Sequence, residues 1–290
     1  MEDQKWNSSF SSYPAIFGFP DEWTEFANRR TEFLRRWANL EKAADVTFDR
    51  THSDTQLWQR VIYFQGRLVY EEFLEILLLC GNGYGIGAQK ILRGMYERAV
   101  TARYLSKHNE EVDNYLAFHR VTDYKLLQSA KTSLKTIIFS KEMADKIEQD
   151  YKAVKDRFKI TDCEKCGTVH ANHTWSKVDI VSMARESEEL LRLLLPAYHL
   201  PTREFHSTMS AIFSRLDAEA AVRGEGLVFD GAAQRDRADD ALFAAHLILL
   251  DMLDLQDESF QVAGLAPLVQ VCREDFNEIW KAQGLIKKDK

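Results

Sequence analysis

The fold is decided by residues 84–105, which read YGIGAQKILRGMYERAVTARYL. Apolar residues recur there at the spacing of three and four that places them on one buried face of an α-helix: Leu92, Met95, Ala99 and Ala102, with Ile91 beside them. Five charged residues run alongside this face: Lys90, Arg93, Glu97, Arg98 and Arg103. Burial of an unpaired charge is costly, so these side chains must be solvated, paired or used in binding. The stretch therefore predicts a central helix that borders a candidate site.

The rest of the chain repeats the helical pattern. Apolar residues at helical spacing predict further helices over 21–40, 55–80, 110–135, 140–158, 179–195, 202–216, 235–255 and 258–281. Pro196 is expected to stop one of them, and Thr202 to cap the next. The sequence has no strictly alternating segment long enough to predict a strand. We therefore expect an all-α fold, a multi-helix bundle of about eight or nine helices with an N-terminal arm. Residues 1–50 would form that arm and an amphipathic helix, and residues 51–290 the helical bundle domain.

The glycines at Gly81, Gly83, Gly85 and Gly87 suggest a phosphate-binding loop at first sight. Such a loop follows a strand, whereas these glycines follow a predicted helix. A helix end and a turn into the central helix explain them better.

Composition and charge narrow the class of protein. The chain has 290 residues, 45% of them hydrophobic and 29% charged, as is usual for a globular protein. A net charge of -7 argues against a generally basic nucleic-acid-binding surface and leaves room for a local basic patch. No uncharged apolar run is long enough to span a membrane, and the N-terminus does not resemble a secretory signal. With Cys80 and Cys272 in apolar helical stretches, a cytoplasmic location is expected.

Three segments carry a resemblance to a known family. They are LRGMYERAVTARYL, the Trp175-Ser176 pair and YHLPTREFHS, in that order. Together they resemble an uncharacterised bacterial all-helical family, a domain of unknown function, over roughly residues 55–220. Its pattern is an Arg-x-x-x-Glu helix, a Trp-Ser helix start, and a Tyr followed by a His-Pro-Ser-like turn. The matching residues are Arg93 with Glu97, Trp175 with Ser176, and Tyr198 with His206-Ser207; the proline of the turn is missing here.

This family is distantly similar to HEPN-type helical bundles, many of which are ribonucleases of toxin or defence systems. The resemblance implies RNA binding or RNA cleavage in bacterial stress or defence. HEPN ribonucleases carry Arg and His on one helix with four to six residues between them. Arg203 and His206 have only two residues between them, which weakens the implied nuclease activity.

The candidate catalytic residues are Arg93, Glu97 and His206. Arg93 and Glu97 lie one helical turn apart, so their side chains can meet. Arg93 would bind an anion while Glu97 orients it or acts as a general base; a structural ion pair is the alternative. His206 would act as an acid or base near neutral pH, or simply bond a backbone carbonyl. His119 and His246 lie on apolar faces and are expected to be core histidines.

A candidate zinc knuckle lies between two predicted helices. Cys163, Cys166, His170 and His173 supply four potential ligands within one short segment, and Gly167 permits the turn that a CxxC pair requires. Four protein ligands would close the coordination shell, so this zinc would be structural. Coincidence is the alternative, and His173 could instead bond backbone near the Trp175 helix start.

Two classes of function remain open. The first is an HEPN-like protein that binds or cleaves RNA. The second is a non-catalytic helical scaffold or adaptor, with structural zinc and a structural Arg93–Glu97 pair, that binds a partner protein. A homodimer is a further expectation. The sequence alone leaves open whether the protein is an enzyme.

Overall fold

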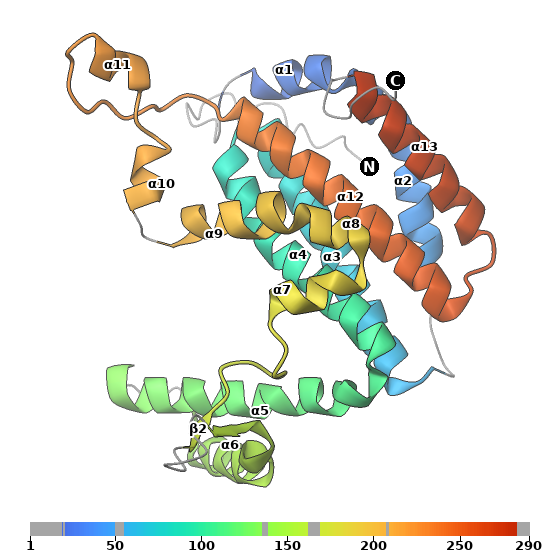
Figure 1. The fold of residues 1–290 in the computed structure, drawn as a ribbon, viewed down its shortest axis with the longest axis vertical. Coiled ribbons are helices and arrows are strands. Elements are labelled where there is room, and N and C mark those ends of the chain that lie inside the picture. The colour runs from blue at the N-terminus through green and yellow to red at the C-terminus, as the bar shows by residue number, and fades with distance from the viewer. Residues whose placement is uncertain are drawn as a thin grey trace, which may run out of the picture.

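The computed structural model describes Phe19 and residues 21–49, 55–134, 139–161, 169–206 and 209–282. These residues are almost entirely helical (Figure 1). The α-helices are α1 (Glu22–Arg29), α2 (Thr31–Phe48), α3 (Leu57–Gly81), α4 (Gly85–Lys107), α5 (Val112–Ser129), α6 (Lys141–Val154), α7 (Ile180–Met183), α8 (Glu188–Leu193), α9 (Leu200–Phe205), α10 (Met209–Phe213), α11 (Ala218–Val222), α12 (Arg235–Phe260) and α13 (Leu265–Ala282). Short 3₁₀ turns are η2 (Asn109–Glu111), η4 (Lys155–Phe158) and η5 (Ala184–Glu186), and π-helical turns are η3 (Ala130–Leu134) and η6 (Leu194–His199).

The core of the molecule lies between the three long helices α3, α4 and α12. The predicted stripe on α4 is confirmed, because Leu92, Met95, Ala99 and Ala102 are all at most 1% exposed. Helices α3 and α12 approach closely at Gly66, where an added Cβ would lie 2.5 Å from Nε2 of Gln256. The same buried amide donates a hydrogen bond to the Ile62 carbonyl at 2.9 Å. This close crossing fixes α12 against α3.

Helices α1, α2 and α13 cover the outer side of α12 (Figure 1). Phe26 and Phe33 are buried in the same core as α12. Arg36 of α2 forms an ion pair with Asp275 of α13, and Asn39 donates to the same carboxylate at 2.7 Å. Residues of the predicted N-terminal helix therefore contribute to the main core.

Helices α5 and α6 form an arm that lies apart from the main body in Figure 1. The arm has a small core of its own, built on Val121, Val154 and Phe158. The rings of Tyr124 and Tyr151 stack at 3.9 Å between the two helices. Two three-residue strands, β1 (Lys159–Thr161) and β2 (Val169–Ala171), pair antiparallel beside them. The sequence did not predict this small sheet.

Helices α10 and α11 project from the main body at the upper left of Figure 1, far from α5 and α6. An antiparallel bridge joins Leu216 to Phe229, and the guanidinium of Arg215 lies 4.9 Å from the Phe229 ring. Several large apolar side chains of α9 and of this segment are more than half exposed: Phe205, Met209, Ile212, Phe213, Leu227 and Phe229. The described residues do not bury this apolar surface.

The prediction of eight or nine helices is too low, because several predicted helices are broken. The segment 179–195 divides into α7, η5, α8 and part of η6, with Ser187 accepting a hydrogen bond from the Leu190 amide to begin α8. Pro196 does not stop the helix. It lies in a π-helical turn in which the Leu200 amide donates to the Leu195 carbonyl, five residues back, and the wider turn accommodates a residue that lacks an N–H.

Other boundaries also differ from the prediction. Thr202 lies inside α9, where its hydroxyl donates to the Tyr198 carbonyl at 2.5 Å, so it is not a helix cap. The helix predicted over 258–281 is divided by Gln261 and Gly264, whose backbones are left-handed, with φ of 49° and 80°. His119 is exposed rather than in the core. The N-terminal arm predicted before residue 19 lies outside the described residues.

The glycine-rich segment forms the predicted helix end and turn. Helix α3 ends at Gly81, and Gly83 has a left-handed φ of 78°. Gly85 begins α4 where an added Cβ would lie 2.3 Å from the Gln234 carbonyl oxygen. This close approach places the start of α4 against the start of α12.

Candidate functional site

Arg93 on α4 is held by three neighbours. Its Nε donates to Oε1 of Glu97 at 3.1 Å, which confirms that the two side chains meet. Its guanidinium carbon lies 5.3 Å from the centre of the Tyr198 ring and 5.4 Å from that of Phe205. Cations are attracted to aromatic ring faces, so the rings and the carboxylate together fix the guanidinium. The Arg93 side chain is nevertheless 21% exposed, and that of Glu97 42% exposed.

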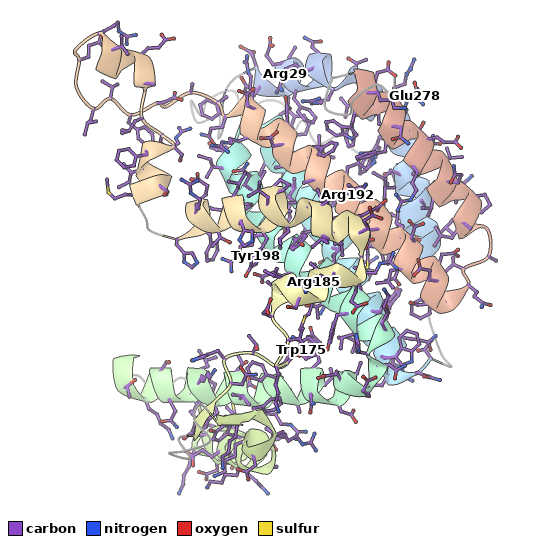
Figure 2. The ribbon with its side chains drawn as sticks, viewed as in Figure 1. Arg29, Trp175, Arg185, Arg192, Tyr198 and Glu278 are labelled. Atoms are coloured by element: carbon purple, nitrogen blue, oxygen red, sulfur yellow. The ribbon has the colours of Figure 1, made fainter. Side chains whose placement is uncertain are left out.

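A pocket of about 560 Å³ opens beside this pair. Its base is a line of three residues on α4, Arg93, Glu97 and Thr101, each one helical turn from the next. Its walls come from α5, from residues 172–180, from α7 and from η6: Phe118, Asn172, His173, Thr174, Trp175, Ser176, Lys177, Val178, Asp179, Ile180, Met183 and Tyr198. Figure 2 shows Trp175 between the main body and α5, with Tyr198 on the side of the body.

Trp175 is set in the wall by two tyrosines and a hydrogen-bonded loop. Its ring meets those of Tyr104 and Tyr115 edge-on, with centroids 5.9 and 5.2 Å apart. The Asn172 side chain donates to the carbonyl of buried Ser176 at 2.9 Å. The Trp175-Ser176 pair does not open a helix as the resemblance implies. Its loop precedes α7, which begins after Asp179.

The two carboxylates of the pocket already have hydrogen-bond donors. Glu97 accepts from Arg93, and Asp179 accepts from the Ser182 amide at 2.9 Å and from its hydroxyl at 3.0 Å. The hydrogen bonds from Ser182 hold the pKa of Asp179 below its usual value. Lys177, by contrast, forms no ion pair with any residue that the structure describes. The pocket therefore combines aromatic walls with cationic groups that remain available.

The charged line of α4 divides into three directions. Arg93 and Glu97 face the pocket, whereas Arg98 pairs with Glu72 of α3 at 2.9 Å. Arg103 is buried and pairs with Asp251 of α12 at 3.0 Å. Burial raises the pKa of both acids, Glu72 and Asp251, above the usual value. Arg98 and Arg103 are thus structural, whereas Arg93 and Glu97 line the pocket of about 560 Å³.

His206 is not among the residues that line the pocket. It follows the last residue of α9, is exposed, and its ring meets that of Phe205 edge-on at 5.5 Å. The Phe205 ring also contacts the Arg93 guanidinium. His206 is therefore separated from Arg93 by Phe205 and does not line the pocket. The catalytic roles of Arg93, Glu97 and His206 stay predictions.

Two of the four predicted zinc ligands, Cys163 and Cys166, lie outside the described residues. His170 belongs to β2, and His173 is exposed and lines the pocket. Within the described part of the chain, no group of three or more potential ligands is close enough to hold a metal ion. Zinc binding stays a prediction.

Sequence reasoning missed four contributors to the site: Thr101, Phe205, Lys177 and Phe118. Thr101 was detectable, because it continues the spacing of four that joins Arg93 to Glu97. Phe205 and Phe118 could not be detected from the sequence, since they come from α9 and α5 and approach α4 only in the folded chain.

Comparison with known proteins gives one match. No curated protein and no solved structure matches the chain. None of the described helices is long and apolar enough to cross a membrane. A family model described as "Family of unknown function (DUF5677)" matches residues 67–222, which include α4, the Trp175 loop and Tyr198. Because this match covers more than half of the chain, the protein belongs to that family of unknown function.

Proposed function

We propose that the pocket beside α4 binds a nucleotide unit of single-stranded RNA. Arg93 contacts the phosphate, and the base packs against the aromatic walls formed by Trp175 and Tyr198. The observation that carries this proposal is the state of Arg93, which is fixed by Glu97 and two rings and still reaches a pocket.

The hydrogen bonds of Arg93 support a phosphate contact. Only Nε donates to Glu97, while Nη1 and Nη2 make no hydrogen bond to any described residue. Two parallel N–H groups match the oxygens of a phosphate, and such charge-assisted pairs are among the stronger hydrogen bonds in proteins. Glu97 thus orients the guanidinium without occupying its outer edge.

The walls of the pocket support binding of a base. Aromatic side chains stack on bases of any identity, and each such contact is worth about 1–3 kcal/mol. Bases are accessible for stacking in single strands but not within an A-form duplex. Glu97 and Thr101 offer polar groups that can bond a ribose 2′-hydroxyl, the group that distinguishes RNA from DNA.

The direct test is binding of fluorescently labelled oligouridine, followed by anisotropy, with wild-type protein and two variants. Arg93→Gln should weaken binding by about tenfold or more, because a charge-assisted contact is lost. Arg98→Gln is the matched control, since it removes the same charge from the same helix outside the pocket. Wild-type protein that binds no RNA, or equal weakening by both variants, would refute the proposal.

Cleavage is a separate part of the proposal. Glu97 lines the pocket and is the candidate general base, while His206 lies beyond Phe205. The same oligouridine, resolved by gel after incubation, decides between binding alone and ribonuclease activity. A role in bacterial stress or defence stays a prediction.

A second candidate function is that of a scaffold that binds protein, and the exposed apolar residues between Phe205 and Phe229 favour it. We propose a second copy of the chain as the partner. Light scattering should then give twice 33.6 kDa for the wild type, and the mass of a single chain for a Phe213→Asp variant. A wild-type protein that stays monomeric at high concentration would end this candidate.

The zinc knuckle of Cys163, Cys166, His170 and His173 remains a proposal for a structural metal. Strands β1 and β2 flank the segment that contains both cysteines. Metal analysis of protein purified without added zinc should find one zinc per chain, and a zinc-free preparation that is folded would exclude it.

A further inference from the structure

A second pocket, of about 280 Å³, also borders the Trp175 loop. It is formed between the start of α5, the turn η4 with β1, and the loop itself. Its lining includes three cations, Arg157, Lys159 and Lys177, and one carboxylate, that of Glu111. It shares Asn172, Trp175 and Lys177 with the first pocket. The two pockets are therefore neighbours with a common wall.

The local structure explains why these cations gather. Phe158 is buried in the core of the arm, with its ring 5.1 Å from that of Phe118. Arg157 and Lys159, one on each side of it in the sequence, are exposed. The Phe158 carbonyl accepts a hydrogen bond from the Asn172 amide at 2.6 Å, which ties this segment to the Trp175 loop. The two cations are thus held against the loop that carries Lys177.

These cations are available for a ligand. Arg157 and Lys177 form no ion pair with any described residue, and Lys159 pairs only with exposed Asp156. An ion pair in solvent contributes little free energy, so a phosphate can replace Asp156 at small cost. Three cations against the carboxylates of Glu111 and Asp156 still give this pocket a net positive charge. The pocket is therefore a local basic patch on a chain whose net charge is negative.

We propose that the second pocket is a phosphate subsite for the same RNA strand. The strand runs from Arg93, past the Trp175 ring, to Arg157, Lys159 and Lys177. The inference rests on the proposed function and extends it: the ligand is an oligonucleotide with phosphates on both sides of Trp175, not a mononucleotide.

The test compares two probes, uridine monophosphate and an oligouridine of about eight nucleotides, a typical length for a single-strand site. Full-length Arg157→Gln/Lys159→Gln protein should bind the oligouridine about tenfold more weakly and the mononucleotide as the wild type does. The slope of log affinity against log salt should become shallower by roughly 1.4, because each lost phosphate contact on a single strand removes about 0.7. The Lys152→Gln/Lys155→Gln variant is the control, since it removes two exposed charges of the same arm outside both pockets.

Each outcome has a distinct meaning. Unchanged oligouridine binding and an unchanged salt slope in Arg157→Gln/Lys159→Gln would overturn the subsite while the Arg93 pocket stands. An equal loss in the control variant would also overturn it, because the effect would then come from net charge alone. If wild-type protein binds neither probe, the proposed function fails and the subsite with it. Both double variants replace exposed residues, so matching melting temperatures are expected and should be recorded.

Discussion

At the scale of single residues, Arg93 differs from its neighbours on α4 in what surrounds its guanidinium. Arg98 and Arg103 end on carboxylates of adjacent helices, whereas Arg93 lies against two rings and one carboxylate of its own helix. A planar guanidinium can stack on rings and still donate along its edge, which an ammonium cannot do.

Arg93→Lys is therefore expected to weaken RNA binding by about fivefold, or about 1 kcal/mol, although the charge is kept. Anisotropy with labelled oligouridine measures the effect. Arg98→Lys should leave the affinity unchanged, because that side chain does not line the pocket. Equal affinity of Arg93→Lys and wild type would show that Arg93 contributes only charge.

His246 is a buried histidine with a stability role, as its apolar surroundings in the sequence predicted. Its Nδ1 accepts a hydrogen bond from Trp280 Nε1 at 3.2 Å, and Phe33 and Phe276 pack against its ring. Burial lowers its pKa from 6.5 to about 3, with the Asp275 charge opposing that shift. The folded state therefore requires a neutral imidazole.

The pH dependence follows from this shift. Above pH 6.5 the histidine is neutral in both states and costs nothing. Below it the unfolded chain binds a proton that the folded chain does not, so stability falls by about 1.4 kcal/mol per pH unit until the folded pKa of about 3. Between pH 7 and 5, the wild type should lose about 2 kcal/mol more than His246→Gln, which keeps an acceptor for Trp280 but does not titrate. Chemical denaturation at both pH values measures it; equal losses would contradict the assignment.

At the scale of elements, the start of α4 depends on a close contact with the start of α12. An added Cβ at Gly85 would lie 2.3 Å from the Gln234 carbonyl oxygen and 2.5 Å from the Ala238 nitrogen, both backbone atoms that cannot rotate away. Gly87, two residues on, has only flexible Leu79 and Tyr84 side-chain atoms nearby, at 3.6 Å and beyond.

The two glycines should consequently respond in opposite directions to alanine. Gly85→Ala should destabilise the protein by about 1–3 kcal/mol, as overpacking does. Gly87→Ala should stabilise it by about 0.5–1 kcal/mol, because alanine is the better residue within a helix. Thermal unfolding of the two variants is a matched comparison. A Gly85→Ala protein as stable as Gly87→Ala would show that α12 moves freely at this end.

A comparison of the predicted and observed helices shows which features of the fold the sequence can predict. Long helices were predictable, since the segments of α3, α4 and α12 carry apolar residues at helical spacing over many turns. The break at Ser187 and the π-helical turn that carries the chain past Pro196 were not, because they depend on local hydrogen bonds that periodicity does not detect. The Arg93–Glu97 contact was predictable from its spacing along one helix, whereas the rings of Tyr198 and Phe205 come from a hundred residues away.

At the scale of the whole molecule, the family match and the core do not coincide. The match covers 67–222, yet α12 lies beyond it and is buried along most of its length. Seven of its large apolar residues are almost fully buried: Leu242, Ile248, Leu249, Leu250, Met252, Leu253 and Leu255. Each such side chain contributes about 1.5–3 kcal/mol, so together they contribute roughly 10–20 kcal/mol, which is as large as the roughly 5–15 kcal/mol by which a typical protein is stable.

A fragment of residues 67–222 should therefore fail to fold by itself. We expect no cooperative thermal transition by circular dichroism and strong binding of a hydrophobic dye, because the faces of α3 and α4 that meet α12 stay exposed. A fragment of residues 19–282 should melt cooperatively and serves as the control. Cooperative melting of the shorter fragment would mean that α12 is dispensable for the core.

The late place of α12 in the chain also bears on biosynthesis. Helix α4 ends at Lys107, and the ribosome must add about 150 further residues before α12 is complete, which takes on the order of 10–30 s at about 5–20 residues per second. Throughout this interval the nascent chain presents the apolar faces of α3 and α4 without their partner. Translation speed and the supply of chaperones, and not only the stability of the finished protein, should then affect how much of it a cell accumulates.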